Sequence, residues 1–263
     1  MEPDPFLRAF LEEKVQTFNC PAFVPEDPVS VPHRYHRLED VEIAGFLAAT
    51  IAWGSRKTIL RNGHRLMDRL GESPFDFVMH ASPEQLDRLD FTHRTFNSED
   101  LRGFILGLRH IYRTFGTLRD LFGRFAEPDT LQPAISRFRT EFFRPPHARR
   151  SEKHISDPLK GSAAKRINMM LRWFVRRDNR GVDLGIWNGV LHPAQLSCPL
   201  DVHSGHIARA LGILRRKQND AEAVRELDAV LRTLDPTDPV KYDFALFGLG
   251  ISREFDGILR ARP

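Results

Sequence analysis

Residues 42–52 read E-I-A-G-F-L-A-A-T-I-A, and this stretch decides the fold class of the chain. Its residues are apolar almost all round a helical projection, and they lack the alternation of apolar and polar positions that marks a half-buried strand. A helix that is apolar on every side must be covered on every side. The stretch therefore predicts a buried central helix against which other helices pack.

Amphipathic helical patterns occupy much of the remaining chain. Residues 101–115, 164–175 and 224–234 carry apolar side chains at three- and four-residue spacing. Ser98 and Asp220 each stand where a helix would begin, just before such a pattern. Proline and glycine separate the segments, and no alternating stretch is long enough for a useful strand. We expect an all-α protein.

The composition is that of an ordinary globular protein, and its 263 residues suffice for one large domain. No apolar run approaches the roughly 20 residues that cross a bilayer, and the acidic N-terminus lacks the layout of a signal peptide. We therefore expect a cytoplasmic protein with no membrane partner. The chain has 39 lysines and arginines against 35 acidic residues, a balance compatible with a polyanionic partner. Its two cysteines cannot hold a four-cysteine zinc or iron–sulfur site.

The first motif with chemical content is G-S-A-A-K-R at residues 161–166, which opens the helical pattern of residues 164–175. A glycine turn that leads into a helix presents backbone N–H groups, and such groups bind phosphate. Arg172 and Arg176 share a helical face with Lys165, so the sequence predicts an exposed basic stripe. An ordinary capped helix with a solvated basic face would show the same pattern. The stretch before it, residues 144–160, is rich in proline and basic residues and is expected to be an exposed, mobile loop.

The second motif is C-P-L-D-V-H-S-G-H-I-A at residues 198–208. Asp201 follows a proline and precedes a helical pattern, so it is a natural N-cap. Asp201, His203 and His206 also form a D-x-H-x-x-H string that could ligate a metal. That alternative needs further ligands, because residues two apart on a helix do not share a face.

Together the two motifs resemble those of the helix-hairpin-helix DNA glycosylases. The segment P-L-D-V-H at residues 199–203 is similar to the P-[LV]-D-[VT]-H segment of that superfamily, and is closest to the 8-oxoguanine branch, including its archaeal members. The G-x-G-x-K hairpin of the family is matched at Gly161 and Lys165, with Ala163 at the second glycine. Residues 42–54 and 238–250 also resemble strings of an uncharacterised bacterial family related to these enzymes.

The resemblance implies a fold and a set of roles. The fold would be one catalytic domain, residues 1–263, with a cleft between two lobes. Lobe one would span about 41–194, including a hairpin at about 152–177, and lobe two would combine about 1–40 with 195–263. Lys165 would be the nucleophile and Asp201 its carboxylate partner, with Lys160 as the fallback nucleophile. The base pocket would contain Phe247, Asp243, Phe244 and His203, and the residues on DNA would be Gly161, Ser162, Arg166, Arg172, Trp53, Ser55 and Arg56.

The chemistry explains why these residue types belong together. A carboxylate stabilises the positive charge that develops on the sugar when a glycosidic bond breaks, and an amine can form a Schiff base at the same carbon. The sequence therefore predicts a monomeric glycosylase with AP lyase activity that removes an oxidised purine, 8-oxoguanine in particular, from duplex DNA without a cofactor. Two alternatives stay open. One is a DNA-binding or damage-sensing protein of the same fold without catalysis, and the other is a metal-dependent hydrolase.

Overall fold

The computed structural model describes residues 4–252, and within them the fold is all-α, as the sequence predicts. Isolated bridges between single residues are the only extended pairings in that range. The outer ends of the predicted second lobe, residues 1–3 and 253–263, lie outside the described part. The α-helices are α1 (Pro5–Phe18), α2 (Leu38–Thr50), α3 (Arg56–Leu70), α4 (Pro74–His80), α5 (Pro83–Asp87), α6 (Ser98–Phe115), α7 (Leu118–Phe125), α8 (Gln132–Phe142), α9 (Lys165–Val175), α10 (Val202–Ala210), α11 (Ala221–Leu234) and α12 (Asp243–Ser252).

Short 3-10 helices make many of the connections. Most of them begin at a proline, whose missing N–H costs nothing at the first helical position. They are η1 (Pro21–Glu26), η2 (Pro28–Ser30), η3 (Pro32–Arg34), η4 (Arg149–His154), η5 (Pro158–Lys160), η6 (Pro193–Gln195) and η7 (Pro239–Tyr242).

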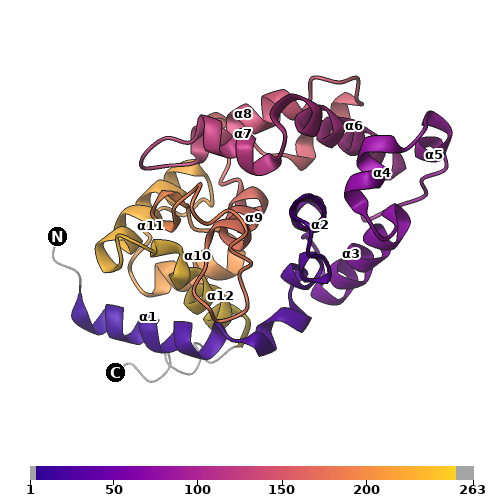
Figure 1. The fold of residues 1–263 in the computed structure, drawn as a ribbon. Coiled ribbons are helices and arrows are strands. Elements are labelled where there is room, and N and C mark those ends of the chain that lie inside the picture. The colour runs from indigo at the N-terminus through magenta and orange to yellow at the C-terminus, as the bar shows by residue number, and fades with distance from the viewer. Residues whose placement is uncertain (1–3, 253–263) are drawn as a thin grey trace.

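Helix α2 is the buried central helix that residues 42–52 predict. Every residue from Asp40 to Thr50 is buried, and Figure 1 looks along this helix with α3, α4, α6 and α9 arranged around it. The closest approach is to α9, where the ring of Phe174 occupies the space that a side chain at Gly45 would need. Helix α9 therefore has a fixed position against α2, and Lys165 is its first residue.

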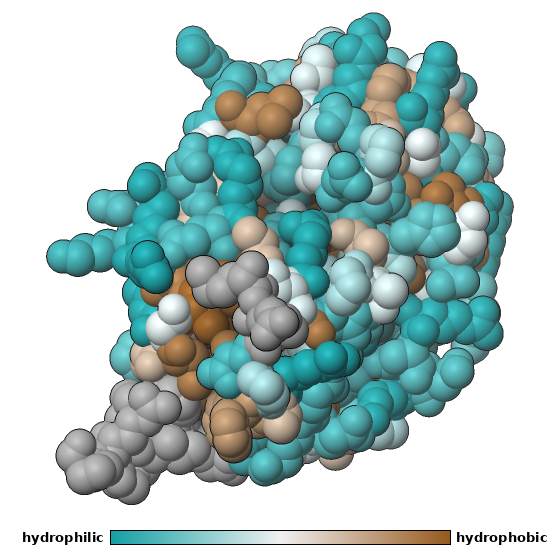
Figure 2. Space-filling model, turned by 90° about the vertical axis from the view of Figure 1, so that its left-hand side faces the viewer, coloured by the Kyte–Doolittle hydropathy of each residue, from teal (hydrophilic) through white to brown (hydrophobic). Residues whose placement is uncertain are grey.

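The apolar side chains form two clusters. The larger contains residues of α2 to α9 together with Phe244 of α12, and the smaller contains residues of α1, α10, α11 and the rest of α12. Figure 2 shows one face of the molecule, which is largely hydrophilic with small, separate apolar patches. No helix in residues 4–252 has the length and the apolar character needed to span a membrane.

Glu42 is the one fully buried acid of α2, and its carboxylate joins three parts of the larger cluster. It accepts hydrogen bonds from the Tyr112 hydroxyl at 2.9 Å, from the Trp187 indole N–H at 2.8 Å, and from the backbone N–H groups of Leu118 and Arg119 at 3.0 Å each. Burial raises the pKa of Glu42 to about 7, although these four donors act in the opposite direction. The side chain thus ties α2 to α6, to the start of α7, and to the segment around Trp187.

Glu42→Ala is expected to lower the free energy of unfolding by about 3 kcal/mol, because buried donors lose their acceptor. Urea unfolding at neutral pH measures the change. Glu39→Ala is the control on the same helix, since Glu39 is partly exposed and pairs with Arg37, and a change within about 1 kcal/mol is expected there. Equal losses in the two variants would show that the buried carboxylate does not hold these helices together.

Candidate active site

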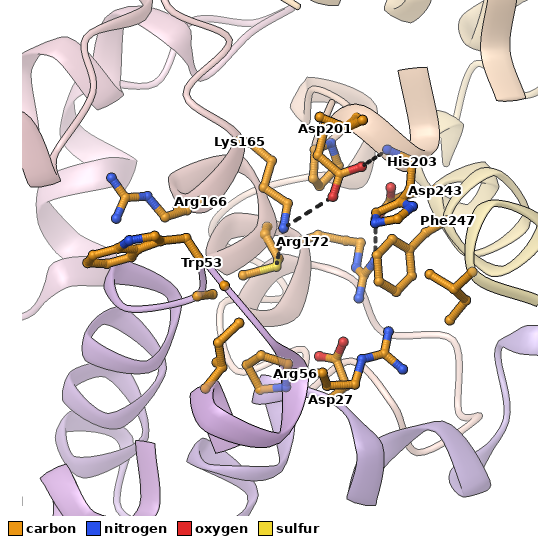
Figure 3. A pocket seen from close by; sticks show the side chains of 18 of the residues that line it. Asp27, Trp53, Arg56, Lys165, Arg166, Arg172, Asp201, His203, Asp243 and Phe247 are labelled. Atoms are coloured by element: carbon orange, nitrogen blue, oxygen red, sulfur yellow. Dashed lines mark hydrogen bonds and ion pairs between the residues drawn. The ribbon is translucent and has the colours of Figure 1, made fainter. Parts of the chain in front are cut away.

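A cavity of about 590 Å³ is lined by residues of α3, α9, α10 and α12 and by the segments that precede α2 and α3. Its size is within the ordinary range for a small-molecule or nucleobase pocket. Figure 3 shows charged and aromatic side chains pointing into it from several elements. The lining residues used below are Phe23, Asp27, Trp53, Arg56, Lys165, Arg166, Met169, Arg172, Asp201, His203, Asp243 and Phe247.

A tight turn places Lys165 at the pocket wall. Gly161 adopts a left-handed conformation with φ of 90°, which a residue with a side chain rarely adopts. Ala164, the N-cap residue of α9, is also left-handed with φ of 44°. The Asn168 side chain donates to the Ala163 carbonyl at 3.0 Å and so fixes the turn to the helix that follows. The sequence motif therefore does form a glycine turn leading into a helix.

Asp201 caps α10 and faces Lys165 at the same time. Its Oδ1 accepts the backbone N–H groups of His203 at 2.8 Å and Ser204 at 3.0 Å, while the Ser204 hydroxyl accepts from the Asp201 N–H. Its Oδ2 lies 3.6 Å from Lys165 Nζ (Figure 3). The cap fixes one oxygen, and this fixes the direction of the other. Two residues that are 36 positions apart in the sequence thus meet in one wall.

Arg172 and Arg176 correct the prediction of an exposed basic stripe. Their exposed fractions are 3% and 1%. Arg172 donates to Asp183 and to Asp243, and Arg176 donates to Asp183 and Asp238. Buried cations need such partners, because desolvation would otherwise cost several kcal/mol. Arg172 lines the pocket from inside this network and is not a surface contact for phosphate, contrary to its predicted role.

Asp243 reaches the pocket from the first turn of α12, and it is buried rather than solvent-facing. Burial raises its pKa to about 6, and the adjacent Arg172 acts against that rise. Its Oδ2 accepts from Arg172, and the Cys198 thiol lies 3.9 Å from its Oδ1. Asp243 is therefore a pocket group that changes charge near neutral pH.

Aromatic rings form two sides of the cavity. The Trp53 ring lies against His93 at 4.9 Å and stacks on His154 at 5.6 Å between centroids, and the Arg166 guanidinium covers it at 4.9 Å. The Phe247 ring lies 5.3 Å from the Arg56 guanidinium. Both rings line the pocket, as does His203. Phe247 and the exposed part of Trp53 give the cavity aromatic surface for a planar ligand, while His154 and Arg166 already pack against the Trp53 ring.

Phe244 is not a pocket residue, contrary to its predicted role. It is buried, it is absent from the pocket lining, and its ring packs 4.2 Å from the Arg172 guanidinium and 5.6 Å from the Phe23 ring. Its position three residues before Phe247 puts it on a neighbouring face of α12, which is turned toward the core.

The predicted DNA-contact residues occupy different environments. Arg166 donates to the Thr50 carbonyl, and burial lowers its pKa to about 10, so it belongs to the pocket wall. Ser55 is the exposed N-cap of α3 and does not line the pocket. Gly161 is exposed, and Ser162 is partly exposed and caps the turn by accepting the Ala164 N–H. Lys160, the fallback nucleophile, is 74% exposed at the turn and is not part of the pocket lining.

The stretch of residues 144–160 is more ordered than its composition predicts. It contains η4 and η5, and Ser151 and His154 are buried. Arg150 donates to Asp100 at 2.7 Å, and Glu152 pairs with Arg139 at 2.6 Å. The prediction of an exposed loop is wrong here, because acids elsewhere in the chain hold its basic residues.

Asp27 is a pocket residue that the sequence did not indicate. Its Oδ1 accepts the Val29 N–H at 3.0 Å at the start of η2, and burial raises its pKa. Arg56 and Arg172 are among the cations that oppose this rise. Its only local signal was an aspartate before a proline, which is also the signature of a plain helix cap.

The D-x-H-x-x-H string does not form a metal site within residues 4–252. That range contains no group of three or more His, Cys, Asp or Glu side chains arranged to hold a metal ion. His203 and His206 are exposed on α10, and the Asp201 carboxylate is committed to the helix cap and Lys165.

Comparison with known proteins gives a family. The model of a family described as proteins of unknown function (DUF2400) matches residues 27–252. The match begins at the pocket residue Asp27 and includes Lys165, Asp201 and Asp243. No curated protein and no solved structure gave a significant match.

The pKa of Asp243 has a consequence for stability. Because it is raised from 3.8 to about 6, the folded state keeps a proton that the unfolded state has lost between these values. The free energy of unfolding contributed by this group therefore falls as pH rises from about 4 to about 6. Asp243→Asn should flatten the curve of stability against pH in this window, as measured by urea unfolding. Asp87→Asn, at an exposed position of α5, is the control, and curves of equal slope for wild type and Asp243→Asn would contradict the assignment.

Proposed function

This chain belongs to the DUF2400 family of unknown function, and we propose that it is a DNA glycosylase with AP lyase activity. One observation carries the proposal: Lys165 Nζ lies 3.6 Å from Asp201 Oδ2 at the wall of a cavity of about 590 Å³. An amine and a carboxylate that converge on one point can act on one sugar carbon. The aromatic rings of Trp53 and Phe247 give the same cavity surfaces for a flipped base.

We propose that the fold is that of the helix-hairpin-helix glycosylases. The two apolar clusters would correspond to two lobes, with one lobe at about 41–194 and the other at about 1–40 plus 195–263, and the cavity would be their cleft. The turn at Gly161 before α9 would be the hairpin, although the segment before it is the 3-10 helix η5 rather than an α-helix. We propose that the protein acts as a monomer on duplex DNA in the cytoplasm.

The chemistry would proceed through a covalent intermediate. Lys165, after giving a proton to the Asp201 carboxylate or to water, attacks C1′ as the bond between C1′ and the base nitrogen breaks. The base leaves with the bonding electrons and takes up the proton that Asp201 or water had accepted. Asp201, again ionised, stabilises the positive charge on the sugar. Opening of the sugar ring gives a Schiff base on Lys165, and loss of a proton from C2′ then expels the 3′ phosphate.

The pocket chemistry favours a purine with additional polar groups, and we propose an oxidised purine such as 8-oxoguanine. Asp243 has a carboxyl group that titrates near pH 6 and can hydrogen-bond the Watson–Crick edge of a purine. Phe247 and Trp53 would contact the faces of the ring system. His203, exposed at the rim on α10, would contact the nucleotide at the entrance.

Lys165→Gln is expected to abolish borohydride trapping of a protein–DNA adduct and to abolish strand cleavage, because no amine remains to form the Schiff base. Duplex binding, measured by fluorescence anisotropy, should be largely retained. Lys160→Gln is the matched control, since it removes an exposed lysine only five residues earlier. Full trapping by Lys165→Gln together with loss of trapping in Lys160→Gln would assign the nucleophile to Lys160.

Asp201→Asn should slow base excision and strand cleavage by about 10²- to 10³-fold, because the stabilising charge is removed. Asparagine caps a helix as well as aspartate does, so the melting temperature should change little. Single-turnover kinetics on a lesion-containing duplex measures the rate. An unchanged excision rate in a folded Asp201→Asn protein would show that this carboxylate has no catalytic role.

One assay distinguishes a catalytic protein from a protein that only binds DNA. Wild-type protein is tested against a panel of duplexes that carry different base lesions and an abasic site, with borohydride present. Trapping on an abasic site alone would support the lyase but not the 8-oxoguanine assignment. Binding without trapping on any substrate would instead favour the damage-sensing alternative.

A further inference from the structure

The loop between α10 and α11 lies directly beside the glycine turn. The Ala221 N–H at the start of α11 donates to the Gly161 carbonyl at 3.0 Å, and Asp220 forms a backbone bridge with Ser162. The loop and the turn therefore share one edge of the molecule. A nucleic-acid strand that contacts the N–H groups of the glycine turn would pass close to residues 212–220.

Side chains hold this loop in a fixed shape. The Arg209 guanidinium donates to the carbonyls of Arg216 at 2.7 Å and Gln218 at 3.2 Å, and to the Asn219 side-chain oxygen at 2.6 Å. The Glu226 carboxylate accepts the N–H groups of Arg215 at 2.7 Å and Arg216 at 3.2 Å. A loop ordered in this way loses little conformational entropy when it binds a partner.

The loop is also connected to the candidate site. The Asn219 side chain donates to the Asp201 carbonyl at 2.8 Å, immediately before α10. Through Arg209 and Asn219, the basic loop is therefore joined to the backbone that carries the Asp201 carboxylate.

The loop is rich in positive charge. Arg215, Arg216 and Lys217 are consecutive and exposed. Arg216 pairs with Asp220 at the start of α11. Within residues 4–252, the side chains of Arg215 and Lys217 make no ion pair, and both are exposed to solvent.

We propose that residues 215–217 are a second contact for the DNA phosphate backbone, adjoining the contact made by the glycine turn. The proposal rests on the proposed function for its partner, since a pocket for a flipped nucleotide requires a charged strand to cross its rim. A nucleic-acid strand brings one negative charge with each nucleotide, and exposed cations beside the glycine turn can neutralise such charges. Arg215 and Lys217 thus contribute to affinity for every sequence alike.

The test is the double variant Arg215→Gln/Lys217→Gln, compared with Arg88→Gln/Arg113→Gln. Arg88 and Arg113 are exposed near the ends of α5 and α6, so the control removes the same charge elsewhere on the surface. Affinity for a fluorescent duplex with a tetrahydrofuran abasic-site analogue is measured by anisotropy over a range of salt concentrations. The slope of log affinity against log salt should become shallower by about 1 for each phosphate that the variant no longer neutralises. The control should keep the wild-type slope.

Equal slopes for the two double variants would overturn the proposal. The wild-type measurements separate this result from failure of the proposed function. If the wild-type protein binds the duplex but borohydride traps no lesion duplex, the proposed glycosylase and lyase chemistry is wrong. The loop proposal is then still tested by the salt dependence of duplex affinity in the Arg215→Gln/Lys217→Gln variant. If the wild-type protein binds no duplex, the loop proposal is overturned together with the DNA partner.

Discussion

Arg172 and Arg176 on α9 pair with acids from three other parts of the chain, and the candidate site depends on these ion pairs. Asp183 accepts from both arginines, Asp243 accepts from Arg172, and Asp238 accepts from Arg176. Two nearly inaccessible cations can be kept only where carboxylates meet them, because an unpaired buried charge costs several kcal/mol. The pairs therefore hold the beginning of α12 against α9. Lys165 and Asp243 reach one pocket as a consequence.

The central helix and the helix starts could be predicted from the sequence because their causes are local. Residues 42–52 are apolar all round, and this alone requires that they be surrounded. Asp201 stands where a cap must stand, and the structure uses it as one. The meeting of Lys165 and Asp201 was not visible in spacing or periodicity. It was expected only because the two motifs resemble those of a known family.

The burial of charge could not be predicted in this way. A basic residue at helical spacing suggests a solvated face, but Arg172 and Arg176 are covered because their partners lie in segments that only the folded chain brings near. Arg150 is exposed, but its ion pair with Asp100 on α6 likewise joins two segments that only the folded chain brings near. Arg172 and Arg176 therefore do not belong to the positive surface of this protein. Asp27 was not predicted as a pocket residue, because a single carboxylate before a proline gives no local indication of a pocket.

The Asp201 side chain both caps α10 and contacts Lys165, and these two roles limit which residues can replace it in evolution. The cap needs a short side chain with an acceptor oxygen, which asparagine, serine or threonine would also supply. The contact with Lys165 needs a negative charge, which glutamate would supply, but from a longer side chain that caps poorly. Aspartate alone meets both needs. A relative without the chemistry could exchange it for asparagine without weakening α10, so the residue found at this position distinguishes family members that retain the charge from those that retain only the fold.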